Sequence, residues 1–115
     1  MPYEIIDIRK LCDRCRVYIS NDLISYLGLN NENREVIFVE NRNGEIIVDN
    51  IKNKEIYENK KIKIIESSIV DNVNRVVIRK GVRKRLGIKR NNFVAFIKYT
   101  KDSGSYIRIC KVEFG

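Results

Sequence analysis

The 115-residue chain contains no histidine, and this absence removes the side chain that most often acts as a general base near neutral pH. Without histidine, the Ser–His and Cys–His pairs that activate nucleophiles in many hydrolases cannot form. The chain also lacks an apolar run close to the roughly 18 residues of a membrane-spanning helix. Its first ten residues lack the basic-then-apolar layout of a signal peptide. We therefore expect a cytoplasmic protein that is not an enzyme and carries no cofactor.

Cysteine is scarce as well, with Cys12, Cys15 and Cys110 as its only occurrences. The first two have the C-x-x-C spacing of half a zinc site. A structural zinc site needs four ligands, however, and the chain offers one further cysteine and no histidine. A second chain could complete such a site, or the pair could form a local disulfide. We favour free thiols and no metal, in keeping with a reducing cytoplasm.

Residue usage is otherwise that of a globular domain, with 43% hydrophobic and 33% charged residues. The net charge of +8 is unevenly distributed, because residues 1–59 hold 8 Lys or Arg against 11 Asp or Glu, whereas residues 60–115 hold 15 against 4. This concentration of positive charge favours a polyanionic partner. Nucleic acid ranks ahead of an anionic membrane, because no long basic amphipathic helix is present. The alternative is a basic face that only water solvates.

The chain resembles itself at an offset of 59 residues. This offset places RVYISNDLISYLGL, residues 16–29, over RVVIRKGVRKRLGI, residues 75–88. The two stretches share an arginine, alternating aliphatic residues and a Leu-Gly pair, with identities at Arg16/Arg75, Val17/Val76, Ile19/Ile78, Leu27/Leu86 and Gly28/Gly87. The same offset aligns two upstream pairs of isoleucines. We interpret the pattern as a tandem duplication of a unit of roughly 55 residues.

Both copies predict the same order of elements: a strand, a polar turn, a second strand, a short helix that ends at a glycine, and a hairpin. In the first copy the ranges are Glu4–Ile8, Arg16–Ile19, Asn21–Leu27, Glu35–Glu40 and Ile46–Val48. In the second copy they are Lys63–Glu66, Arg75–Ile78, Lys80–Leu86, Phe93–Tyr99 and Tyr106–Val112. The domain organisation is therefore a first repeat at 1–48, a polar linker at 49–61 and a second repeat at 62–115. A helical turn around Ile56 and Tyr57 is an alternative to a fully extended linker.

The string Arg-Val-Val-Ile at 75–78, the short basic helix, Leu-Gly-Ile at 86–88 and the final hairpin resemble the AbrB, MazE and SpoVT family of prokaryotic and viral DNA-binding proteins. The resemblance covers residues 5–48 and 64–112. In that family two units interleave their hairpins into one barrel, normally as a homodimer. The resemblance implies a mainly β fold with short helices, in which two tandem ββαββ-type repeats form one swapped-hairpin β-barrel. Pairing of units across two chains stays open, because the linker can span tens of ångströms when extended.

Family members related to AbrB carry arginines at recurrent positions on the side that faces DNA. Carried over by position, these are Arg9 in the first strand, Arg16 and Arg75 at the start of the second strands, and Arg83 with Lys84 on the second helix. The first copy has Ile24 and Ser25 at the helix positions, and the second copy has Ser68 in place of the first-strand arginine. The resemblance therefore implies that the second copy supplies the stronger DNA surface.

The start of the second helix favours the same conclusion on physical grounds. A helix N-terminus carries partial positive charge and unpaired N–H groups, so it prefers an acid or a hydrogen-bond acceptor. The second copy instead has Arg79, Lys80 and Gly81 there, and phosphate would suit this combination. Arg85 is expected to face solvent on the same helix. The alternative is that Arg79 and Lys80 reach acids of the first copy.

We expect Phe38, Phe93 and Phe96 in the core and no exposed row of aromatic side chains for stacking on single strands, so duplex DNA is the expected partner. The sequence thus predicts a nucleoid-associated transcriptional regulator of AbrB-like type. The predicted DNA-binding residues are Arg9, Arg16, Arg75, Arg79, Lys80, Arg83, Lys84 and Arg85. The alternative is an antitoxin-like subunit or other interaction module that binds an acidic partner protein. A homodimer remains open in either case.

Overall fold

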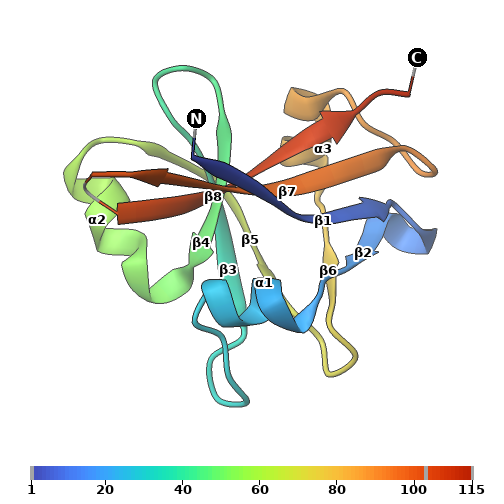
Figure 1. The fold of residues 1–115 in the computed structure, drawn as a ribbon, viewed down its shortest axis with the longest axis horizontal. Coiled ribbons are helices and arrows are strands. Elements are labelled where there is room, and N and C mark those ends of the chain that lie inside the picture. The colour runs from blue at the N-terminus through green and yellow to red at the C-terminus, as the bar shows by residue number, and fades with distance from the viewer. Residues whose placement is uncertain (1, 103, 115) are drawn as a thin grey trace.

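The computed structural model of the protein describes residues 2–102 and 104–114 (Figure 1). Within these residues the chain forms eight strands and five short helical segments. In chain order they are β1 (Tyr3–Lys10), η1 (Asp13–Cys15), β2 (Arg16–Tyr18), α1 (Asn21–Tyr26), β3 (Glu35–Glu40), β4 (Ile46–Asn50), η2 (Ile51–Asn53), α2 (Lys54–Asn59), β5 (Lys63–Ile69), β6 (Arg75–Val77), α3 (Lys80–Leu86), β7 (Phe93–Lys101) and β8 (Gly104–Val112). The predicted mainly β fold with short helices is confirmed. None of the helices in the described part of the chain is long and apolar enough to cross a membrane.

Six strands form one antiparallel sheet in the order β1-β7-β8-β4-β3-β5, and β2 pairs with β6 in a separate two-stranded ribbon. The sheet is open, with β1 and β5 as its edges, so the predicted closed barrel is not observed. The ribbon strands span three residues each and offer few backbone groups to continue a ladder along either edge. A side chain instead connects edge strand β5 to ribbon strand β6, since Ser68 Oγ donates to the carbonyl of Val77 at 2.8 Å.

Strands from the two halves of the chain exchange partners within the sheet. β1 pairs with β7 and β5 pairs with β3, so each first strand lies beside the hairpin of the other half. β2 pairs with β6, and β4 pairs with β8. In the ribbon, Val17 lies opposite Val76. The hairpins at 35–50 and 93–112 are thereby joined into one sheet.

The register of these pairs also recurs between the halves. Arg9 lies opposite Val94, and Ser68 lies opposite Val36. β1 and β5 each contain one irregularity, at Ile6 and Ile65, where the pairing skips a residue. Such bulges bend a strand and increase its local twist, so both edge strands curve at equivalent places.

The main core lies between the sheet, the ribbon and helices α1 and α3. Its fully buried side chains, each at most 3% exposed, include Phe38 and Phe96 from the sheet, Val17 and Val76 from the ribbon, and Leu23 and Val82 from the helices. Helices of six and seven residues are too short to be stable alone. The burial of these apolar side chains therefore holds α1 and α3 in position.

Both helices end at a glycine in the left-handed conformation, as predicted. Gly28 and Gly87 each have a φ of +67°. The residue after each glycine closes the helix end, since Leu29 N donates to Ile24 O at 3.1 Å and Ile88 N donates to Arg83 O at 3.0 Å.

The predicted polar linker, residues 49–61, does more than bridge the two halves. It completes β4 and then forms η2 and α2, which confirms the helical turn around Tyr57. Ile51 and Tyr57 pack on the second face of the sheet, against the cluster formed by Ile37, Val39 and Ile47. Burial, followed by a hydrogen bond to the Asp49 carboxylate, raises the pKa of Tyr57 well above its usual value. Figure 1 shows α2 on the opposite side of the molecule from the ribbon.

The prediction that three phenylalanines lie in the core is confirmed only in part. Phe38 and Phe96 are buried, whereas Phe93 is half-buried and meets Phe114 edge-on, with ring centroids 5.1 Å apart. Tyr3, Tyr99 and Tyr106 form a stacked surface row, with centroids 5.9 and 5.4 Å apart. The sequence did not predict this stacked row, of which Tyr3 is exposed while Tyr99 and Tyr106 are half-buried. Only the pairing of β1, β7 and β8 brings these residues together, and their sequence spacing carries no sign of it.

Candidate nucleic-acid interface

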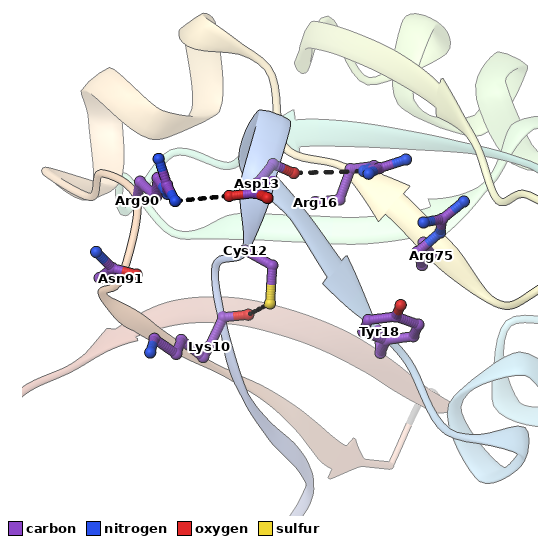
Figure 2. A pocket seen from close by; sticks show the side chains of 8 residues that line it. All are labelled: Lys10, Cys12, Asp13, Arg16, Tyr18, Arg75, Arg90 and Asn91. Atoms are coloured by element: carbon purple, nitrogen blue, oxygen red, sulfur yellow. Dashed lines mark hydrogen bonds and ion pairs between the residues drawn. The ribbon is translucent and has the colours of Figure 1, made fainter.

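A basic hollow lies at one side of the β2–β6 ribbon (Figure 2). It has a volume of about 370 Å³ and is lined by Lys10, Cys12, Asp13, Arg16, Tyr18, Arg75, Arg90 and Asn91. These residues come from the end of β1, the η1 turn, both ribbon strands and the loop between α3 and β7. Four of them are cations and one is an anion. We call this site the ribbon hollow, and its excess of positive charge attracts anions.

The register of the ribbon explains why two predicted arginines meet in this hollow. Arg16 lies opposite Val77, and Tyr18 lies opposite Arg75. Neighbouring strand residues point to opposite faces, so burial of the central valines turns both arginines and the tyrosine away from the core. The Arg75 guanidinium lies over the Tyr18 ring, 5.9 Å from its centroid.

Acidic groups hold some of these cations. Arg75 Nε donates to Asp71 Oδ2 at 2.8 Å, and Arg90 Nη2 lies 2.7 Å from Asp13 Oδ1. Burial acts to raise the pKa of Asp71, but hydrogen bonds from the Arg75 backbone and side chain outweigh it and lower that pKa. The hydrogen bond to Asp71 likewise raises the pKa of Arg75. Ion pairs as exposed as these are weak, so a polyanion can compete for the cations.

The turn beside the hollow lacks a side chain that fills the related turn of the other half. Arg34 extends across residues 70–74, where its side chain donates to Val70 O and Asp71 O at 3.0 Å each and to Asn74 Oδ1 at 2.8 Å. Asn92 occupies the equivalent backbone position, since Leu11 N donates to Asn92 O just as Val70 N donates to Arg34 O, both at 2.8 Å. The shorter Asn92 side chain instead accepts from the backbone of Lys89, which leaves the turn at 11–15 without this brace.

Helix α3 does not border the ribbon hollow, and its N-terminus is already occupied by an acid. The Glu66 carboxylate on β5 accepts from Arg79 N at 2.8 Å and from Val82 N at 2.9 Å. In the other half, Asp7 accepts from Ser20 N at 2.9 Å in the same way. The N–H groups that were expected to await a phosphate are therefore taken.

The five basic side chains of the α3 segment fall into two groups. Arg79 donates to Ser67 O at 3.0 Å, Arg83 donates to Ile78 O at 3.2 Å, and Arg85 donates to Glu40 Oε1 at 3.3 Å. The alternative, in which Arg79 and Lys80 reach acids of the first half, is not observed among the described residues, and Arg85 makes such a contact instead. Lys80 and Lys84 are exposed, and their side chains form no hydrogen bond or ion pair with other described residues.

Arg9 takes a different place from the other predicted arginines. Its Nη2 lies 3.5 Å from Asp7 Oδ1, and Asp7 is only 6% exposed. Its Nε is buried and has no hydrogen-bond partner among the described residues. Arg9 therefore neutralises a buried acid and does not line the ribbon hollow.

Lys10, Arg90 and Asn91 line the hollow but were not predicted. Arg90 ends the basic stretch 75–90, and Lys10 follows Arg9, so both lie next to residues that the sequence singled out. Their approach depends on the pairing of β1 with β7, which no local spacing reveals.

The three cysteines are free thiols, as expected, and each is half-buried. No group of three or more His, Cys, Asp or Glu side chains that could hold a metal ion occurs within residues 2–102 and 104–114. A comparison with models of known protein families finds no match, and a comparison with curated proteins finds none either.

Proposed function

We propose that this protein binds double-stranded DNA through the ribbon hollow and the lysines of α3, and acts as a transcriptional regulator of AbrB-like type. One observation carries the proposal. Arg16 and Arg75, the two arginines that the resemblance marks at the start of the second strands, lie in one two-stranded ribbon and border one hollow. Lys10 and Arg90 add positive charge around the same hollow.

The proposal includes the AbrB-like architecture. In it, repeats at 1–48 and 62–115 exchange their hairpins, and the segment 49–61 joins them. The exchange of strand partners and the recurrence of register between the halves support this origin. The ribbon then lies where a swapped-hairpin barrel would close, between the two edge strands of the open sheet.

Phosphate contacts are the main source of affinity in this mechanism. Arg16 and Arg75 lie at opposite ends of the ribbon, on the same face and on different strands, so each can contact a different phosphate of the duplex. Lys80 and Lys84 on α3 extend these contacts along the backbone. Sequence selection then comes from groove shape and from a few arginines, and it is modest.

Binding to a labelled random-sequence duplex across a salt series, with the matched single strand as control, tests the proposal. We expect tight duplex binding that weakens steeply with salt, because each neutralised phosphate contributes about −0.9 to the slope of log K against log salt. Weak duplex binding at low salt would leave the basic surface to an acidic partner protein, and the proposal would fail. Stronger binding to the single strand would also reject it.

A further inference from the structure

The second face of the six-stranded sheet is covered over only half of its width. On β3 and β4, helix α2 and its flanking residues cover Ile37, Val39 and Ile47, which are 1%, 0% and 8% exposed. On β1, at the other side, Tyr3, Ile5 and Ile8 are 56%, 52% and 47% exposed. One half of this face is thus a packed interior, while the other half presents apolar side chains to water.

The exposed half forms one continuous apolar surface. Tyr3 lies opposite Tyr99 on β7, and Ile5 lies opposite Ile97. Ile97 and Tyr99 alternate with the core residues of β7 and therefore point to the second face. We call the surface formed by Tyr3, Ile5, Ile8, Ile97 and Tyr99 the open face. A contiguous apolar patch of this kind on a small protein marks an interaction site.

The open face meets the surface that α2 already covers at Tyr106, whereas Arg108, which lies opposite both Ile97 and Ile47, separates the two further along β8. Tyr106 packs with the cluster under α2, and its ring also stacks on that of Tyr99, with centroids 5.4 Å apart. The strand pair β1–β7 corresponds to the pair β5–β3 in the exchange of partners. The segment 49–61, which joins the two halves, contributes one helix, α2, and this helix covers β3 and β5. Among the described residues, no helix occupies the equivalent position over β1 and β7.

Charge at the rim of the open face favours an acidic occupant. Lys10 and Lys101 are exposed at opposite ends of the patch, and Lys101 Nζ lies 5.3 Å from the centroid of the Tyr106 ring. Face-to-face packing of two copies would bring these cations together, whereas an acidic partner would neutralise them.

We propose that the open face binds a short amphipathic helix of a partner protein, with an isoleucine- or tyrosine-bearing apolar stripe and acidic flanks. The helix would lie over β1 and β7 as α2 lies over β5 and β3. The contact is of the helix-in-groove kind, in which apolar anchors three or four residues apart supply most of the affinity. This site lies on the sheet face away from the main core, and Lys10 is the one residue among those named for it that also lines the ribbon hollow.

A synthetic peptide provides the probe. It carries residues 50–62 of this chain with its four lysines replaced by glutamate, and its binding to the full-length protein is followed by fluorescence anisotropy. We expect binding to the wild type and about tenfold weaker binding to the double variant Ile5→Thr, Ile8→Thr, because two aliphatic groups that the peptide would bury are lost. Threonine is chosen because it is β-branched like isoleucine and therefore favours the strand equally. Ile56→Thr on α2, 50% exposed but outside the open face, is the matched control and should bind as the wild type does.

Amide exchange confirms the location, since the peptide should slow exchange in β1 and β7 and leave α2 unchanged. Equal peptide affinity for the wild type and the Ile5/Ile8 variant would overturn the proposal, and so would no binding to the wild type. A dimer in sedimentation equilibrium that the Ile5/Ile8 variant abolishes would identify a second copy as the occupant instead. Binding of oligo-dT that Tyr3→Ser abolishes would identify single-stranded nucleic acid.

Discussion

At the scale of single residues, Glu66 explains the start of helix α3. Its carboxylate accepts hydrogen bonds from two backbone N–H groups at the helix N-terminus. The helix can therefore begin with the basic residues Arg79 and Lys80, because Glu66 supplies the acidic cap from another strand. Gly81 belongs to the same arrangement, because a Cβ at this position would lie 2.9 Å from Ile65 Cγ2 and 3.2 Å from a Glu66 oxygen. The glycine lets the first turn of α3 approach β5 closely enough for the cap to form.

Replacing Glu66 by alanine should lower the free energy of unfolding by about 2 kcal/mol, because two backbone N–H groups lose a charged acceptor. Urea denaturation of the wild type and of Glu66→Ala measures the difference. Glu58→Ala, which removes an exposed acid from α2, changes the net charge equally and should leave the midpoint unchanged. If both variants unfolded at the wild-type midpoint, the cap would contribute nothing to stability.

The residues at this helix start also show why the sequence did not identify Glu66 as the capping acid. Arg79, Lys80 and Gly81 form a combination that local stability would not select, and phosphate was the natural partner to infer. The acid that completes the site comes from β5, and a turn and the ribbon strand β6 separate it from the helix. No helix rule connects positions so far apart, so only the fold could reveal the contact.

At the scale of elements, the strands and helices were largely predictable. Alternating aliphatic residues gave the ribbon strands, and apolar residues four apart gave the short helices, to within one or two residues at each end. The packing of segment 49–61 was not predictable. Its composition is polar. Ile51 and Tyr57 pack against apolar side chains of β3 and β4, and this contact cannot be inferred before the position of those strands is known.

The packing of α2 predicts a stability difference at alkaline pH. The pKa of Tyr57 is higher in the folded state than in the unfolded chain, so its stabilising contribution is complete below about pH 10 and is lost as the pH rises further. Tyr57→Phe should be about 1 kcal/mol less stable than the wild type at pH 7, because the hydrogen bond to Asp49 is lost.

Above pH 10 this difference should shrink, since the variant lacks the titrating group. Thermal unfolding from pH 7 to 11 measures the effect, and Tyr26→Phe, at an exposed tyrosine, is the control. A constant difference between wild type and Tyr57→Phe across this range would contradict the account.

At the scale of the whole molecule, strands from the two halves of the chain pair with one another in one sheet. Each first strand is completed by the hairpin of the other half, so neither half has a full sheet by itself. The sequence alone left open a pairing of units across two chains, because linker length does not decide between the two. The packing of α2 against the sheet shortens the path between the halves and favours the intrachain arrangement.

Sedimentation equilibrium of the full chain at micromolar concentration should therefore give a single species of 13.6 kDa. A species of twice this mass that persists on dilution would show that units pair across chains. Urea should unfold the chain in one cooperative step, because the two halves share their sheet and main core.

The central claim is that the arginines of the ribbon hold duplex DNA, and the salt dependence of binding for the double variant Arg16→Ala, Arg75→Ala tests it most directly. We predict weaker binding at every sequence and a salt slope smaller in magnitude by about 1.8, since two phosphate contacts are lost. The matched variant Lys54→Ala, Lys60→Ala removes the same charge from the α2 segment and should keep the wild-type slope. Equal slopes for the two double variants would contradict the account.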